Sequence, residues 1–300
     1  MVTGAFSYTG RYVTRLLLNR GWQVRTLTNH PGRRDSFGGA VDVFRYDFEH
    51  PEAMRAAFDG ATTLINTYWI RFPRGQATFE RAVGNSRALI GVARDAGVRR
   101  VVHVSIANAS RESPLAYYSG KAQVEDIVAA SGLAHTILRP TVIFGAEDIL
   151  INNIAWFVRH FPVFAVPGDG RYGLRPIYVE DMARLIADAA DDGGAGGQIV
   201  NAVGPETFAF RELVGRIASL IGVRARIAHV PPRVAYAGTR MTGWFVRDVV
   251  LTWEEYLGLM ANLLVVDGPA TGPTRLTQWL GDYRKQVGRY YASELERHYR

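Results

Sequence analysis

The chain of 300 residues is 48% hydrophobic, which suits one large domain or a main domain with a smaller appendage. The absence of cysteine excludes disulfides, thiol catalysis and zinc–thiolate sites. Its 35 basic and 28 acidic residues give a net charge of +7, but the arginines are spread without a basic block, which favours a solvated surface and a polyanionic ligand over nucleic-acid binding.

The seven histidines are scattered without the spacing of metal ligands, so we expect no metal site. No stretch reaches the ~20 apolar residues needed to cross a bilayer, and the chain opens on a folded element rather than on a signal peptide. We therefore expect a cytoplasmic protein without a membrane span.

The first residues predict a strand, a glycine-bearing loop and a helix. Val2–Thr3 favours a strand, Gly4–Gly10 a tight turn, and Arg11–Arg20 an amphipathic helix. Ser7 holds the middle place of the three-glycine pattern of dinucleotide-binding loops. A second β-prone stretch, Trp22–Thr28, completes a βαβ unit. The helix N-terminus of such a unit binds a pyrophosphate through unpaired N–H groups and the positive end of the helix dipole.

The end of the second strand indicates which dinucleotide is bound. Thr28 and Asn29 offer no carboxylate for the ribose 2′-hydroxyl of NAD. Arg33 and Arg34 follow, and arginine is the residue type that accommodates the 2′-phosphate of NADP. We expect NADP, with NAD as the alternative if Asp35 takes the acidic role.

The alternation of strands and helices then continues. We expect strands over 41–46, 62–66 and 99–105, a short helix after Pro51 and a long helix over 79–97. Tyr68, Trp69 and Phe72 follow the strand over 62–66. These rings either wall a substrate pocket at the carboxyl ends of the strands or pack a long loop onto the body.

A helix predicted over 117–131 carries Tyr117 and Lys121, which are four residues apart and therefore neighbours on one face. Val124 and Val128 continue that stripe, so the pair is expected to point inward. An ammonium beside a phenol lowers the phenol pKa from about 10. Tyr117 can then act as general acid or base, and Lys121 can also hold a ribose.

Beyond Gly145 the regular alternation ends. We expect helices over 149–161, 183–190, 210–221, 252–265 and 277–298, and strands over 176–182, 198–203 and 223–230. Thr252 and Glu255 fit a capping box. The terminal helix is expected to dock on its own domain, with a subunit contact or a peripheral membrane contact as the alternative.

Several motifs occur in order: Thr3-Gly4-x-x-Ser7-x-x-Gly10, Asp47 after the third strand, His103–Ser105, Tyr117-x-x-x-Lys121 and Thr136–Gly145. Together they resemble the short-chain dehydrogenase/reductase superfamily over about residues 1–205. Within it, the chain looks like the atypical, NmrA-like branch, near the nucleotide-binding accessory subunit of respiratory complex I and bacterial sugar-nucleotide epimerase-like proteins.

The resemblance implies an α/β fold, a Rossmann-type doubly wound parallel sheet with a small, mainly helical C-terminal lobe. The NAD(P)-binding domain would span 1–145, with 174–204 returning to it, and the substrate lobe mainly 146–300. The resemblance implies cofactor contacts from Gly4, Ser7, Tyr8, Thr9 and Gly10 at the pyrophosphate, Asp47 and Phe48 at the adenine, Asn66 and Thr67 at the adenosine side, and Lys121 and Pro140 at the nicotinamide end.

The leading hypothesis is an NADP-preferring oxidoreductase that transfers a hydride to a small carbonyl or quinone substrate. Tyr117 and Lys121 would carry the proton chemistry, with Ser105 as a third catalytic group. An oligomer is also compatible with this hypothesis.

Two alternatives stay open. A sugar-nucleotide epimerase or dehydratase would need a second diphosphate site, built from two of Arg171, Arg175 and Arg247. A cofactor-binding sensor or structural subunit without turnover is suggested by Ile106 and Ala107, which stand where the superfamily usually carries its active-site serine.

Overall fold

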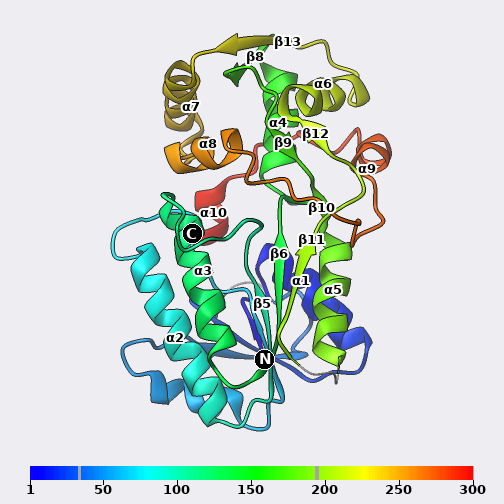
Figure 1. Ribbon diagram of the computed structural model, residues 1–300. Coiled ribbons are helices and arrows are strands. Elements are labelled where there is room, and N and C mark those ends of the chain that lie inside the picture. Colours follow the sequence, from blue (N-terminus) through cyan, green and yellow to red (C-terminus); the bar gives the residue numbers. More distant parts are fainter. Residues whose placement is uncertain (33–34, 193–195, 300) are drawn as a thin grey trace. The chain divides into compact units, whose positions relative to one another are not determined.

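The structure is a computed structural model that describes residues 1–32, 35–192 and 196–299 (Figure 1). The chain divides into two compact units. The first comprises Met1–Pro140 and Glu180–Ala202, and the second comprises Thr141–Val179 and Val203–Arg300.

Within the described residues, seven parallel strands form the central sheet of the first unit. Their order across the sheet is β11 (Gln198–Ala202), β6 (Ala134–Pro140), β5 (Arg100–Val104), β4 (Thr63–Asn66), β1 (Val2–Thr3), β2 (Val24–Thr28) and β3 (Val41–Arg45). The direction of winding reverses between β1 and β4, as in doubly wound folds. The expected Rossmann-type α/β fold is confirmed.

Helices cover both faces of this sheet. α1 (Tyr8–Asn19) and α5 (Val179–Asp191) lie on one face, and α2 (Phe79–Asp95) and α3 (Ala116–Ala129) lie on the other (Figure 1). A 3₁₀ helix, η1 (Pro51–Phe58), follows β3. Leu64 and Val101 of the sheet share a fully buried core with Leu89 of α2 and Val124 of α3. Apolar strands covered on both sides explain why the sequence pattern of this unit is easily recognised.

The second unit contains the remaining elements: β7 (Ile143–Phe144), α4 (Leu150–His160), β8 (Val163–Pro167), β9 (Gly173–Leu174), β10 (Ile177–Tyr178), β12 (Phe208–Ala209), α6 (Phe210–Leu220), β13 (Arg226–Val230), α7 (Pro232–Val246), α8 (Trp253–Met260), α9 (Leu276–Asp282) and α10 (Glu294–Tyr299). Its core packs Ile151 of α4 against Leu213 of α6 and Leu280 of α9. The capping box expected at Thr252 is present, because its hydroxyl accepts from Glu255 N–H and the Glu255 carboxylate accepts from Thr252 N–H.

The expectation of one terminal helix over 277–298 is wrong. α9 ends at Asp282, and α10 begins only at Glu294. Gly288 between them has φ +66°, and a Cβ there would lie 2.4 Å from the backbone nitrogen of Trp156. The glycine lets this segment pass directly against α4 with Val287 buried, and its left-handed φ does not belong to a right-handed helix.

The helix α7 (Pro232–Val246) has no counterpart among the sequence-based expectations. It contains Gly238 and Gly243, which weaken the helical pattern. Ala235 and Gly243 are its buried residues, so it lacks the continuous apolar inner stripe by which a helix is recognised.

A buried carboxylate organises the start of α4. One oxygen of Asp148 accepts from Ile151 N–H at 2.7 Å, and the other accepts from Gly145 N–H at 3.2 Å and from the Asn152 side chain at 2.9 Å. Burial outweighs these hydrogen bonds and raises the pKa of Asp148 from 3.8 to about 6.

This raised pKa predicts a pH-dependent stability. The folded carboxyl binds its proton more tightly than the unfolded one, so the free energy of unfolding falls as pH rises from about 4 to about 7. A shift of two units corresponds to about 3 kcal/mol. Urea unfolding of the wild type and of Asp148→Asn across this range should show the wild type losing about that much stability relative to the variant, whereas parallel curves would contradict the assignment.

Candidate functional site

The glycine loop determines where α1 begins. Gly4 has φ +67°, and a Cβ on Gly10 would lie 2.1 Å from the Gly4 carbonyl oxygen, so both positions require glycine. Ser7 is the N-cap, and its hydroxyl accepts from Gly10 N–H at 3.3 Å. Tyr8 and Thr9 are the first residues of α1, whose first turn has no acidic residue. This helix N-terminus can therefore receive an anion.

Hydrogen bonds join β1 and β4 at their carboxyl ends, beside this loop. Thr67 N–H donates to the Thr3 hydroxyl at 2.7 Å, and the Thr67 hydroxyl donates to the Thr3 carbonyl at 2.5 Å. The strand order reverses between these two strands, which is where open α/β sheets bind their ligands.

The side chain of Asn66 belongs to the interior of this junction. It donates to His103 Nδ1 at 3.2 Å, and its oxygen accepts from Tyr68 N–H at 3.1 Å. Burial, followed by the charge of Lys121, holds the pKa of His103 well below its usual value. A neutral His103 that accepts at Nδ1 carries its proton on Nε2, and this nitrogen is buried without a hydrogen-bond partner among the described residues.

The end of β2 bears on the choice of dinucleotide. Asn29 is exposed just after the strand. Asp35, the alternative acidic residue, accepts from Phe37 N–H at 2.7 Å and from Gly39 N–H at 2.5 Å, both in its own loop. The expectation for Arg33 lies outside the described residues.

The residues expected at the adenine surround an aromatic cluster. Phe48 stacks on Tyr46 with ring centroids 4.9 Å apart, and Tyr68 packs against both rings. Asp47 accepts from His50 N–H at 2.9 Å, and this hydrogen bond is the main cause of its lowered pKa. Tyr68 thus lies with Phe48, one of the residues expected at the adenine. Trp69 belongs to a different ring cluster, with Phe79 and Tyr117.

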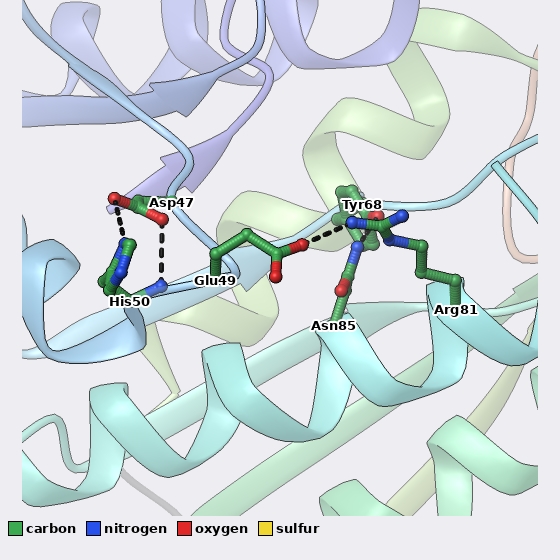
Figure 2. Close-up of polar contacts among 6 residues, drawn as sticks. All are labelled: Asp47, Glu49, His50, Tyr68, Arg81 and Asn85. Carbon is green, nitrogen blue, oxygen red and sulfur yellow. Dashed lines mark hydrogen bonds and ion pairs between the residues drawn. The ribbon is translucent and has the colours of Figure 1, made fainter. Parts of the chain in front are cut away.

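Figure 2 shows how polar contacts hold this region in place. Glu49 pairs with Arg81 of α2 at 2.5 Å, and Asn85 of the same helix donates to the Tyr68 hydroxyl at 2.8 Å. Both contacts connect loops at the carboxyl end of the sheet to α2. The loops are therefore held by α2 as well as by the ring contacts between Tyr68 and Phe48.

Lys121 is buried at the carboxyl end of β5, as the stripe on α3 predicted. Its ammonium donates to the Val104 carbonyl at 2.9 Å and lies 4.9 Å from the centre of the Trp69 ring. Burial lowers its pKa from 10.5 to about 7, opposed by the charge of Glu125. Glu125 itself pairs with Arg139 at 2.5 Å, and Lys121 has no ion-pair partner in the described part of the chain.

Tyr117 and Lys121 meet at the same indole. The Tyr117 ring packs edge-on against Trp69 and Phe79, with centroids 6.0 and 5.8 Å away. A Cβ on Gly120 would lie 3.0 Å from the Trp69 ring, so this glycine lets the indole approach the helix. Neither Gly120 nor Phe79 was identified from the sequence, because a glycine inside a helix gives no signal of what lies against it.

The remaining expected site residues differ in their surroundings. Ser105 is buried, and its hydroxyl has no hydrogen-bond partner within the described residues. Pro140 ends β6, and its carbonyl accepts from Ala107 N–H at 2.8 Å, which places it across from the segment after Ser105. Phe72 is buried, with the Arg71 guanidinium 5.8 Å from its ring centre.

Two kinds of feature are absent from the described residues. No group of three or more His, Asp or Glu side chains there could hold a metal ion. No described helix combines the length and the apolar character needed to cross a bilayer.

Comparison with known proteins decides the family. Residues 4–153 match the family described as NAD(P)H-binding. The chain belongs to this family. Within the superfamily resemblance described above, this result confirms the atypical, NmrA-like assignment.

The individual relatives share less than 30% sequence identity with this chain. Subunit 9 of the 1 alpha subcomplex of the mitochondrial NADH dehydrogenase (ubiquinone) of Arabidopsis thaliana is 28% identical over 83% of this chain, which spans 64% of that protein's length. Ceramide reductase of Caulobacter vibrioides is 28% identical over 81% of this chain and 77% of its own. An NADPH-dependent quinone oxidoreductase of Escherichia coli, solved with NADPH, has a TM-score of 0.76 at 19% identity, covering 95% of this chain and 98% of its own.

The buried ammonium predicts a second pH effect. Lys121 is protonated in the unfolded chain up to pH 10.5 but in the folded chain only to about 7, so folding releases a proton between these values and the free energy of unfolding rises with pH. Lys121→Met should be more stable than the wild type at neutral pH, with an advantage that shrinks by about 2 kcal/mol between about pH 7 and about pH 9.

Lys285 is exposed and is the only other lysine, so Lys285→Met is the matched control. Chemical denaturation of the three proteins across this range measures the effect. A constant difference between Lys121→Met and the wild type would show that the ammonium is not buried in solution.

Proposed function

We propose that the protein is an NADPH-dependent reductase of an apolar carbonyl or quinone. The observation that carries the proposal is the buried Lys121, without an ion-pair partner among the described residues, against the same indole as Tyr117. The unpartnered hydroxyl of Ser105 follows the strand whose last carbonyl accepts from Lys121. Perturbed titratable groups collected in this way are typical of catalytic sites.

The roles follow from the contacts. The pyrophosphate would bind at the N-terminus of α1, over Gly4 and Ser7, and Lys121 would hold the nicotinamide ribose. Bound there, NADPH would supply the hydride for the carbonyl carbon. Tyr117 donates the proton to the carbonyl oxygen, and the Ser105 hydroxyl donates a hydrogen bond to that oxygen. A protonated Lys121 stabilises the phenolate that Tyr117 becomes.

The preference for NADPH rests on the end of β2. No carboxylate ends that strand, and Asp35 is engaged with the backbone of its own loop. A carboxylate so engaged is poorly placed to accept from a ribose 2′-hydroxyl.

An apolar substrate is supported by the surroundings of Tyr117, where Trp69 and Phe79 stack with centroids 6.0 Å apart. The names of the Caulobacter and Escherichia coli proteins point to reduction of lipid-like or quinone substrates. The epimerase alternative has less support. Arg175 donates to the carbonyls of Gly204, Val266 and Gly268, which leaves it little capacity for a second diphosphate.

A thermal-shift titration tests the cofactor assignment. NADPH at about 100 times its dissociation constant should raise the free energy of unfolding by about 2.7 kcal/mol, and NADH at the same concentration should raise it less. Gly10→Ala should abolish the shift, because its methyl group displaces the Gly4 carbonyl. Gly91→Ala, in open space on α2, is the control that keeps it. A larger shift with NADH would overturn the NADPH preference.

Steady-state turnover tests the catalytic assignment, with a benzoquinone and a long-chain aliphatic ketone as probes. Tyr117→Phe should lower turnover at least about 100-fold and leave the NADPH thermal shift intact, because only the transferable proton is lost. Tyr118→Phe, the neighbouring tyrosine on α3, is the matched control and should retain activity. Undiminished turnover in Tyr117→Phe would refute the role. A wild type that binds NADPH but reduces neither probe would favour a non-catalytic subunit.

A further inference from the structure

The helix α7 exposes a stripe of large apolar side chains. Val234 and Met241 are 57% and 66% exposed, and Trp244 and Phe245 are 79% and 73% exposed. At 3.6 residues per turn, Val234, Met241 and Phe245 align along one face, with Trp244 beside them. Single exposed apolar residues are ordinary, but four on one helix mark an interaction surface.

The opposite face of α7 is already packed. Ala235 and Gly243 are buried, and the Thr239 hydroxyl lies 2.5 Å from the Tyr256 hydroxyl of α8. α7 and α8 lie side by side (Figure 1). The second unit therefore uses one face of α7 for its own packing and leaves the apolar stripe uncovered.

The charge beside the stripe has one sign. Arg233 and Arg240 are exposed and seven residues apart, so they follow one border of the stripe, and the exposed Arg247 caps the helix beside Trp244 and Phe245. The sequence from Pro231 to Arg247 contains no acidic residue. Asp248, which follows, is buried, and its carboxylate accepts from the backbone N–H groups of Glu294 and Leu295 at 2.8 and 2.9 Å. The surface is thus complementary to a negatively charged partner.

A hollow adjoins the stripe. A cavity of about 800 Å³ has Arg240, Trp244, Arg247, Val250 and Leu251 among its lining residues. Its two guanidinium groups suit the phosphate of a lipid headgroup, and its apolar side chains suit the first carbons of an acyl chain.

We propose that α7 docks the protein on the surface of an anionic phospholipid bilayer. Met241, Trp244 and Phe245 enter the boundary between headgroups and acyl chains, and the three arginines contact lipid phosphates. Tryptophan and phenylalanine beside basic residues are the composition of helices that lie in this interface. A second copy of the chain fits less well, because a twofold-symmetric contact that pairs the two α7 helices antiparallel would bring their arginine borders together.

Co-sedimentation of the full chain with vesicles tests the proposal. Vesicles of phosphatidylcholine containing phosphatidylserine should bind the wild type, and phosphatidylcholine alone should bind it at least about tenfold more weakly. Trp244→Ala combined with Phe245→Ala should weaken binding to the anionic vesicles at least about tenfold. Each of Arg240→Gln and Arg247→Gln should weaken it about fivefold, with an effect that salt reduces.

Controls separate docking from folding. Tyr290 is 75% exposed outside the stripe, so Tyr290→Ala should bind anionic vesicles like the wild type. All variants should keep the wild-type thermal unfolding, because the changed side chains are exposed. Arg216→Gln, an exposed arginine of α6, is the control for the loss of a positive charge.

The absence of cysteine allows a direct test of insertion. An environment-sensitive fluorophore on Met241→Cys should shift to the blue with anionic vesicles, and the same label on Arg216→Cys should not. Undiminished binding in the Trp244→Ala, Phe245→Ala variant, or no binding by the wild type, would overturn the proposal. The proposal would also be overturned if the wild type dimerised without lipid and the Trp244→Ala, Phe245→Ala variant did not, because a second copy of the chain would then cover the stripe.

Discussion

The close approach of Gly10 to the Gly4 carbonyl is the constraint on which the first unit depends. It determines where α1 begins, and therefore where the unpaired N–H groups and the positive end of its dipole point. β1 contributes only two residues, so the pairing of strands alone holds this junction weakly. The hydrogen bonds between Thr3 and Thr67 add to it by joining β1 to β4 at the loop. The proposed cofactor site is thus positioned by steric fit and side-chain hydrogen bonds more than by a long central strand.

The burial of Lys121, also at the carboxyl end of the sheet, lowers the stability of the folded protein because its ammonium loses contact with water. Glu125 lies one turn further along α3, but Arg139 pairs with its carboxylate, so among the described residues the ammonium contacts a carbonyl oxygen and an indole ring but no ion-pair partner. An apolar side chain would fill this position with greater stability. A buried cation, the Nε2 of His103 and the Ser105 hydroxyl all lack a full set of partners within the described residues. Destabilising groups concentrated at one place are expected where a protein has traded stability for function.

The sequence was sufficient where local pattern and tertiary environment agree. The strands of the first unit are apolar because helices cover both faces, so their alternation with α2 and α3 could be predicted from the sequence. The inward direction of Lys121 could also be predicted, from the stripe on α3. Prediction failed where the reason lies in a distant contact. Gly288, in the segment between α9 and α10, lies against the backbone of Trp156, and nothing in the sequence around Gly288 signals that approach. The division of the aromatic segment, with Tyr68 near Tyr46 and Trp69 against Gly120, likewise depends on side chains from other elements.

The C-terminal end of α7 shows how a weak helix can present a defined surface. A Cβ on Gly243 would lie 2.7 Å from the Asp248 carbonyl oxygen, so only glycine lets the chain fold back there. Arg247 adopts the left-handed conformation at φ 52°, and Asp248 N–H donates to the Gly243 carbonyl at 2.9 Å. This turn closes the helix just after Trp244 and Phe245 and keeps Arg247 beside them. The glycine that weakens the helical pattern therefore also brings the two exposed rings and a guanidinium together at one end of the helix.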